Sequence, residues 1–256
     1  MAGLMLRPSF GDSAGDDPLK LDLNSLQLVF QSFEQRDRIH VDSLSDLELS
    51  TSGGMKRSAD YYSKLAKQRN FPARSVFKLE EMQDRFSLLG EGQKVLDVGS
   101  APGSWSQYCL QRLGAKGQLV GVDLEPVVVS PQFAGYYRFV QGDIFSQAIF
   151  STLSELGPFD VILSDAAPRT SGSGLVDAQR SLELAERVLE IVECTLNPGG
   201  HLVVKIFQGG EEGQLLRRMK SLFHHARAFK PKASRGESRE TYFLGQLFRA
   251  KVEKKA

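Results

Sequence analysis

The residues best suited to chemistry lie at the ends of apolar runs. The first run, residues 94–98, leads through Gly99 and Gly103 into a segment with helical spacing. A glycine turn between a strand and a helix lets the backbone approach a ligand closely, and the helix N-terminus offers unpaired N–H groups. This pattern predicts a site for a nucleotide-like ligand at the carboxyl end of a parallel strand.

Two aspartates extend the predicted site. Asp123 ends the run 118–122, where an acidic residue can hydrogen-bond both ribose hydroxyls of an adenosine. Asp143 follows the run 137–141 and can accept from an adenine amino group while Ile144 packs on the ring. Each residue alone would be a turn glycine or a helix cap, but three sites at successive strand ends favour a ligand.

The glycine spacing argues against a nicotinamide enzyme. The dinucleotide fingerprint is G-x-G-x-x-G, whereas Pro102 stands between Gly99 and Gly103 here. The pattern of acidic residues at strand ends instead resembles S-adenosylmethionine-dependent methyltransferases.

Alternating strands and helices must position these residues. We expect helices near 58–69, 74–88, 104–114, 146–156, 177–196 and 211–223. The expected strands lie near 94–98, 118–122, 137–141, 159–164, 200–206, 226–230 and 241–249. This alternation predicts an α/β fold with a doubly wound, mostly parallel, seven-stranded sheet of the S-adenosylmethionine-dependent methyltransferase type.

Five ordered motifs carry a more specific resemblance. They are the segments 74–79 (RSVFKL), 101–107 (APGSWSQ), 163–168 (LSDAAP), 203–209 (VVKIFQG) and 234–242 (SRGESRETY). Together they resemble the RrmJ/FtsJ family of RNA ribose 2′-O-methyltransferases over about residues 56–249. The resemblance implies a catalytic Lys-Asp-Lys-Glu set at Lys78, Asp165, Lys205 and Glu240. It also implies S-adenosylmethionine as cofactor, contacted by Gly103, Trp105, Asp123, Asp143 and Asp165.

One residue departs from the family pattern. The family usually reads Ala-Pro-Gly-Gly-Trp, and Ser104 replaces the second glycine here. Serine is small and suits a helix N-terminus. We expect it to be tolerated, provided that the position does not need a positive φ.

The expected chemistry requires help for a weak nucleophile. A ribose hydroxyl must be aligned with the sulfonium methyl group and must lose a proton. Lys205 as general base would have to be neutral, which burial or the neighbouring cation Lys78 would favour and the carboxylates Asp165 and Glu240 would oppose. A charged Lys205 that only steers the hydroxyl's lone pair is the alternative.

The resemblance implies an RNA substrate, and a uridine of 23S rRNA within the 50S subunit is the leading expectation. Transfer RNA and messenger RNA caps are alternatives, because relatives with those substrates share the core. A non-catalytic ribosome-assembly factor is a different class of function, which the intact Lys-Asp-Lys-Glu set argues against. A small-molecule methyltransferase would not need the basic clusters described next.

Charge is distributed unevenly along the chain. Residues 1–55 hold 4 Lys/Arg and 9 Asp/Glu, and we expect them to be an acidic, poorly ordered extension before a methyltransferase domain at 56–256. The segments 56–78 and 217–239 hold seven and eight basic residues with one acidic residue each. Such clusters favour a phosphate-backbone partner, although either alone could be a solvated face.

Composition sets the remaining bounds. A length of 256 residues fits one α/β domain with an extension, and the apolar runs are too short to cross a bilayer. Cys109 and Cys194 form no disulfide or metal pattern, so we expect buried free thiols in a reducing cytoplasm. The four histidines show no metal-ligand spacing, and we expect a monomer without a metal or a membrane.

Overall fold

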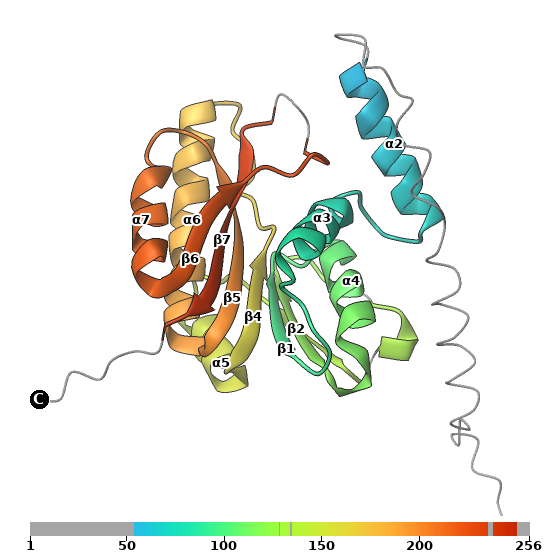
Figure 1. The fold of residues 1–256 in the computed structure, drawn as a ribbon, viewed down its shortest axis with the longest axis vertical. Coiled ribbons are helices and arrows are strands. Elements are labelled where there is room, and N and C mark those ends of the chain that lie inside the picture. Colours follow the sequence, from blue (N-terminus) through green and yellow to red (C-terminus); the bar gives the residue numbers. More distant parts are fainter. Residues whose placement is uncertain (1–53, 128, 134, 235–237, 250–256) are drawn as a thin grey trace, which may run out of the picture. The chain divides into compact units, whose positions relative to one another are not determined.

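Seven strands form one sheet in the computed structural model, which describes residues 54–127, 129–133, 135–234 and 238–249 (Figure 1). The strands lie in the order β3-β2-β1-β4-β5-β7-β6. Their bounds are β1 Lys94–Val98, β2 Gln118–Asp123, β3 Tyr137–Gln141, β4 Phe159–Ser164, β5 Leu196–Phe207, β6 Phe223–Phe229 and β7 Glu240–Phe248. The helices are α2 Gly54–Gln68, α3 Val76–Phe86, α4 Ser104–Leu113, α5 Gln147–Leu156, α6 Gly174–Thr195 and α7 Glu212–Leu222, with short 3-10 turns η1 Gly114–Lys116 and η2 Pro131–Phe133.

The predicted topology is confirmed. Strands β1 to β5 pair in parallel, while β7 is antiparallel to both β5 and β6. Helices α4, α5 and α6 join successive parallel strands, as expected for a doubly wound sheet, while only the short η2 lies between β2 and β3 in the described residues. The carboxyl ends of β1, β2, β3, β4 and β5 therefore meet at one edge of the sheet, where the sequence places its acidic residues.

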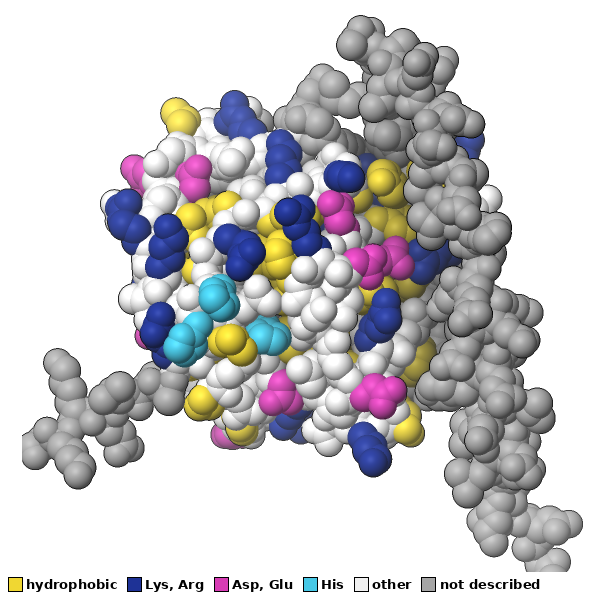
Figure 2. Space-filling view, in the orientation of Figure 1, with side chains coloured by type: hydrophobic (Ala, Val, Ile, Leu, Met, Phe, Trp, Pro, Cys, Tyr) yellow, Lys and Arg dark blue, Asp and Glu magenta, His cyan; other side chains and the backbone are white. Residues whose placement is uncertain are grey.

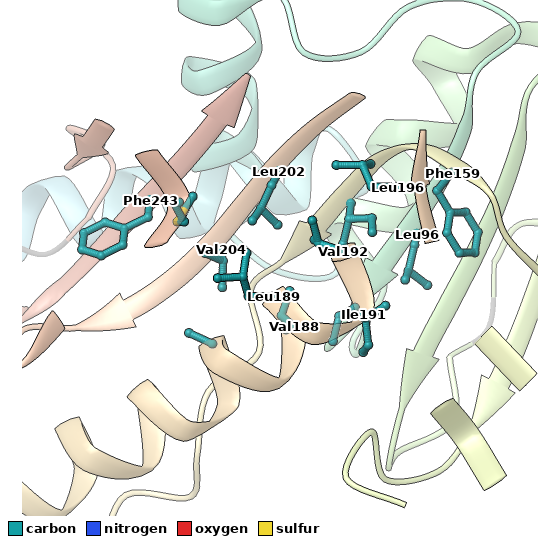
Figure 3. Close-up of a cluster of buried hydrophobic side chains, with 14 of the residues drawn as sticks. Leu96, Phe159, Val188, Leu189, Ile191, Val192, Leu196, Leu202, Val204 and Phe243 are labelled. Atoms are coloured by element: carbon teal, nitrogen blue, oxygen red, sulfur yellow. The ribbon is translucent and has the colours of Figure 1, made fainter. Parts of the chain in front are cut away.

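Apolar side chains cover both faces of the sheet. On one face, α5, α6 and α7 pack on the strands, and Figure 3 shows Val188, Leu189 and Val192 of α6 against Leu202 and Val204 of β5. On the other face, α3 and α4 pack over the strands, with Ala66 of α2 in the same cluster. This second face also carries the residues of the predicted catalytic set.

Several predicted boundaries differ from the structure. Helix α2 begins at Gly54, four residues before the expected start, and α6 begins at Gly174 rather than near 177. Strand β5 begins at Leu196 and includes the Pro198-Gly199-Gly200 segment that we expected as a turn. That segment is irregular, because Gly199 has φ 83° and the register with β4 shifts there.

Two sequence predictions need separate comment. Cys109 is buried as expected, but Cys194 is exposed on α6. Residues two apart on a helix point to different sides, and because Val192 faces the core, Cys194 faces the solvent. The prediction of a poorly ordered extension at residues 1–55 concerns positions that lie, except for the start of α2, outside the described residues. It stays a prediction.

Candidate active site

The four residues of the Lys-Asp-Lys-Glu set come from adjacent elements. Lys78 lies in the first turn of α3, and Asp165 directly follows the end of β4. Lys205 lies near the end of β5, and Glu240 is the first residue of β7. Because β4, β5 and β7 are neighbours in the sheet, the fold brings these residues together from distant parts of the sequence.

The set forms two ion pairs. Lys78 Nζ lies 2.6 Å from Glu240 Oε1, and Lys205 Nζ lies 3.1 Å from Asp165 Oδ1. Lys205 Nζ also donates a hydrogen bond to the backbone oxygen of Asp165. The two lysine side chains are each 9% exposed, so both amines are held in an environment largely shielded from solvent. Buried lysines of this kind need such partners.

Tyr242 connects the two ion pairs, and the sequence interpretation gave it no role. Its hydroxyl donates to Asp165 Oδ1 at 2.7 Å, and its ring lies 5.8 Å from Lys78 Nζ. Burial, followed by the nearby charges of Asp165 and Glu240, holds the pKa of Tyr242 well above its usual value, so the hydroxyl remains a donor. The signal was present, because residues two apart on a strand share one face and Tyr242 follows Glu240 by two.

The register of β5 and β7 supports the same arrangement. Lys205 pairs directly with Tyr242, so both side chains project from one face of the sheet. Ser234 extends the cluster, since its hydroxyl donates to Glu240 Oε1 at 3.0 Å. The sequence analysis predicted neither the pairing of Lys205 with Tyr242 nor the hydrogen bond of Ser234 to Glu240. Ser234 lies in an irregular segment before β7, where no local pattern indicates its partner.

The glycine turn beside this set needs its glycines. Gly99 has φ 77°, and a Cβ there would come within 2.6 Å of the Ala166 backbone, directly after Asp165. Gly103 has φ 105° and stands immediately before α4. The loop after β1 therefore packs closely on the loop after β4, which only glycine permits.

Ser104 satisfies the condition set by the sequence analysis. It is the first residue of α4 and has helical backbone geometry, so no glycine is required. Its hydroxyl accepts a hydrogen bond from Ala73 N at 2.6 Å. This hydrogen bond links the N-terminus of α4 to the segment that leads into α3, the helix that carries Lys78.

The two aspartates at the ends of β2 and β3 lie where the sequence predicts. Asp123 is half-buried, and its carboxylate accepts from Ala101 N and from Glu125 N, both at 2.9 Å. Asp143 is exposed and accepts from Phe145 N at 2.9 Å. Each carboxylate oxygen can accept a further hydrogen bond, so both groups retain capacity for a ligand.

Trp105 is more deeply placed than the two aspartates. It is 3% exposed, its Nε1 donates to Ser75 O at 2.9 Å, and its ring centroid lies 5.9 Å from that of Tyr242. Trp105 therefore packs against the sheet and the catalytic set, with α3 held by its indole N–H.

Asp97 lies beneath the glycine turn and has one unsatisfied oxygen. It is fully buried on β1, where its Oδ2 accepts from Ser106 at 2.7 Å and its Oδ1 has no partner. Burial raises the pKa of Asp97 to about 7, against the lowering effect of the Ser106 hydrogen bond. The sequence interpretation treated Asp97 only as part of the apolar run.

Within the described structure, only some basic residues of the two predicted clusters are exposed and outside ion pairs. In the first, Lys78 belongs to the catalytic set and Arg69 forms an ion pair with Glu80 at 2.9 Å. In the second, Arg218 pairs with Glu193 at 2.6 Å, whereas Lys220 and Arg227 are exposed. Charge along the sequence is therefore only partly available at the surface.

A protein-family model for FtsJ-like methyltransferases matches residues 71–248. The match includes every residue of the Lys-Asp-Lys-Glu set and of the glycine turn. The chain belongs to the FtsJ-like methyltransferase family.

Curated members of the family are similar over most of their length. A ribosomal RNA large subunit methyltransferase E from Treponema denticola is 46% identical over 190 residues, which cover 74% of this chain and 95% of that protein. The protein of the same name from Nitratidesulfovibrio vulgaris (strain DSM 19637 / Miyazaki F) is 45% identical over 192 residues, covering 74% and 94%. A crystal structure described as a ribosomal RNA methyltransferase from Plasmodium falciparum has a TM-score of 0.62 and 29% identity, covering 70% of this chain and 98% of that one.

FtsJ-like methyltransferases use S-adenosylmethionine, and the described residues fit this cofactor. The glycine turn at Gly99 and Gly103 lies at the carboxyl end of β1 and leads into the N-terminus of α4. The carboxylates of Asp123 and Asp143 follow at the ends of the next two strands. This donor and acceptor set suits an adenosine with its ribose.

No helix in the described part of the chain is long and apolar enough to span a bilayer. Likewise, those residues contain no group of three or more His, Cys, Asp or Glu side chains arranged to hold a metal ion.

Proposed function

We propose that this chain transfers the methyl group of S-adenosylmethionine to a ribose 2′-hydroxyl of large-subunit ribosomal RNA. The observation that carries the proposal is the pair of buried ion pairs, Lys78–Glu240 and Lys205–Asp165, beside the glycine turn. The names of the curated relatives support the choice of ribosomal RNA. A uridine of 23S rRNA, within a 50S subunit in the cytoplasm, is the finer form of the same proposal.

Lys205 is assigned the role of orienting the nucleophile. Bound S-adenosylmethionine supplies a methyl group that its sulfonium already activates. Lys205 Nζ donates to two oxygens of Asp165, which fixes the direction of the amine. A 2′-hydroxyl that accepts from this amine would keep one lone pair free for attack on the activated methyl group. Its proton would pass to water as the C–O bond formed and S-adenosylhomocysteine was released.

The other members of the set hold this arrangement. Asp165 accepts from Lys205 and from Tyr242, so its carboxylate is fixed by two donors. Lys78 and Glu240 form the second pair above the Tyr242 ring, and they supply a cation and a carboxylate that can bind ribose or phosphate oxygens. Gly103, Asp123, Asp143, Asp165 and Trp105 are assigned to the cofactor, with Trp105 acting through its packing on Tyr242.

Methyl transfer from labelled S-adenosylmethionine, measured in parallel on undermethylated 50S particles, naked 23S rRNA and tRNA, tests the proposal. Nuclease digestion to nucleosides then locates the label. We expect label in a 2′-O-methyl nucleoside of large-subunit rRNA and background counts in tRNA. Label in a base, or transfer to tRNA alone, would refute the proposed substrate, and absence of transfer to all three would refute the proposed reaction.

A further inference from the structure

A second cationic site lies at the free edge of the sheet. A shallow pocket of about 440 Å³ is lined by Lys220 of α7 and by His224, His225, Ala226 and Arg227 of β6. We name it the β6 pocket. Strand β6 is the last strand of the sheet and pairs only with β7. Figure 2 shows histidine side chains among Lys and Arg side chains on this face of the molecule.

The positive charge of the β6 pocket is not neutralised within the described residues. Lys220 and Arg227 are exposed, and neither forms an ion pair there, in contrast to Arg218 on the same helix. Arg227 instead packs its guanidinium over the Phe86 ring, 5.5 Å from the centroid. Along the sequence, the segment from 213 to 234 contains no Asp or Glu. A cluster of basic groups without carboxylates costs self-repulsion unless an anion binds.

The pocket and the candidate active site lie at different levels along strand β7. His225 pairs with Gln246 of β7, and Lys205 of β5 pairs with Tyr242 of the same strand. Four residues along β7 thus separate the two levels, or about 13 Å along the strand. Both β5 and β6 are antiparallel to β7, so β6 runs from the pocket toward the end of the sheet that holds Lys205.

Basic side chains lie along the edge of the sheet between the two sites. Helix α3 covers the face of β7 there, since Phe86 lies 5.2 Å from the Phe229 ring and Gln246 donates to Phe86 O. At the end of α3, the exposed Arg85 places its guanidinium 5.1 Å from the centre of the Phe229 ring. Lys230 continues the basic surface beyond the end of β6, where its amine donates to Ser238 O at 2.9 Å. A basic route therefore leads from the β6 pocket toward the catalytic end of the sheet.

We propose that the β6 pocket binds backbone phosphates of the RNA substrate, about 13 Å along the sheet from the nucleotide that is methylated. This inference rests on the proposed function. Phosphate contacts of this kind position a substrate without reading its sequence. Basic side chains on an edge strand can alternatively serve only to prevent strand pairing between molecules.

Matched double variants separate these two roles. Lys220→Gln with Arg227→Gln removes one lysine and one arginine at the β6 pocket. Lys116→Gln with Arg138→Gln removes the same charges at the opposite side, where Lys116 precedes β2 and Arg138 lies on the other edge strand, β3. All four side chains are exposed, so folding should be retained, and S-adenosylmethionine affinity and thermal unfolding check this. The RNA probe is naked, undermethylated 23S rRNA.

We expect the β6-pocket variant to bind this RNA about tenfold more weakly at 0.1 M salt, with a slope of log affinity against log salt smaller by about 1.4, as for two lost phosphate contacts. The KM for RNA should rise with kcat unchanged, and the control variant should match the unmodified protein.

Equal affinity and slope for the two variants would overturn the proposal, and so would self-association of the β6-pocket variant without loss of RNA affinity. If the unmodified protein binds RNA through the pocket but transfers no methyl group, the proposed function fails while this inference stands.

Discussion

Tyr242 is the residue on which the two ion pairs of the candidate active site depend. Its hydroxyl holds the Asp165 carboxylate, which in turn holds Lys205, while its ring lies beneath Lys78. Tyr242 is 0% exposed, so water cannot replace the hydroxyl without a rearrangement. Asp165 should therefore lose part of its orientation when this single donor is removed.

Tyr242→Phe should lower the single-turnover rate of methyl transfer about tenfold, which corresponds to one hydrogen bond to a charged group. The affinity for S-adenosylmethionine should stay within about twofold, because the phenyl ring still packs on Trp105. Rapid-quench kinetics with labelled cofactor measures the rate. Tyr61→Phe, which changes an exposed tyrosine, serves as control. An unchanged rate in the Tyr242 variant would show that Asp165 is held well enough by Lys205 alone.

A second prediction for a single residue concerns Asp123 and the binding of the cofactor. Asp123→Asn should weaken S-adenosylmethionine binding by about 1–3 kcal/mol, since a charge-assisted hydrogen bond to the ribose is lost. Titration calorimetry measures the affinity. Glu125→Gln is the control, because it removes an exposed carboxylate two residues away. Equal affinities for the two variants would exclude Asp123 as a ribose ligand.

At the scale of elements, sequence patterns were informative wherever apolar spacing was regular. The strand bounds of β1 and β4 and the start of α4 agree with the predictions to the residue. The start of β5 was missed because Pro198, Gly199 and Gly200 are typical turn residues, yet the strand continues through them as an irregularity between the pairs Phe159–Leu196 and Val161–His201. The start of α6 was missed because Gly174 is a poor helix former, although Asp177 in the first turn favours a helix N-terminus there.

The candidate site was predictable in part for a related reason. Motifs identified Lys78, Asp165, Lys205 and Glu240, since each lies at a recognisable end of an element. The contacts of Ser104 with Ala73 and of Ser234 with Glu240 were not predictable, because they join loops whose course no local pattern determines. Asp97 was missed because a carboxylate inside an apolar run gives no sign of its unpaired oxygen.

Asp97 on β1 makes stability depend on pH. Burial raises its pKa to about 7 in the folded protein, well above the usual value near 4 in an unfolded chain. The folded state therefore binds more protons between these values, and the free energy of unfolding falls as pH rises from about 4 to about 7.

The Asp97→Asn variant has no titrating group at this position. Its free energy of unfolding should therefore not fall with rising pH for this reason. Its free energy of unfolding relative to the unmodified protein should increase between pH 4.5 and 7.5, by up to about 4 kcal/mol. Urea unfolding at several pH values measures the difference. Asp84→Asn, at an exposed position on α3, should show no such trend. A difference that is independent of pH would mean that Asp97 is charged in the folded protein throughout this range.

At the scale of the whole molecule, the described contacts begin with α2. Its Ala66 is 2% exposed, and its Tyr62 ring lies 5.3 Å from the ring of Phe77 on α3. Helix α2 therefore contributes to the core that positions Lys78. We propose that residues 1–54 are dispensable for this core, as their acidic composition predicts.

A chain starting at Met55 should fold and methylate RNA at close to the full-length rate, because it retains these contacts. A chain starting at Arg74 lacks α2 and should unfold at a lower temperature, since Phe77 loses its partner. Circular dichroism and a methyl-transfer assay compare the two with the full-length protein. An insoluble or inactive Met55 chain would show that the preceding segment is part of the working enzyme.

The central claim is that Lys205 acts directly in methyl transfer, held by Asp165 at the end of β5. The most direct test is the single-turnover rate of Lys205→Ala on undermethylated large-subunit rRNA, with S-adenosylmethionine affinity measured on the same preparation. We predict a loss of about two decades in rate with cofactor affinity within about twofold, because the amine that orients the reacting hydroxyl is lost. A rate within about threefold of the unmodified protein, with the label still found in a 2′-O-methyl nucleoside, would contradict the account.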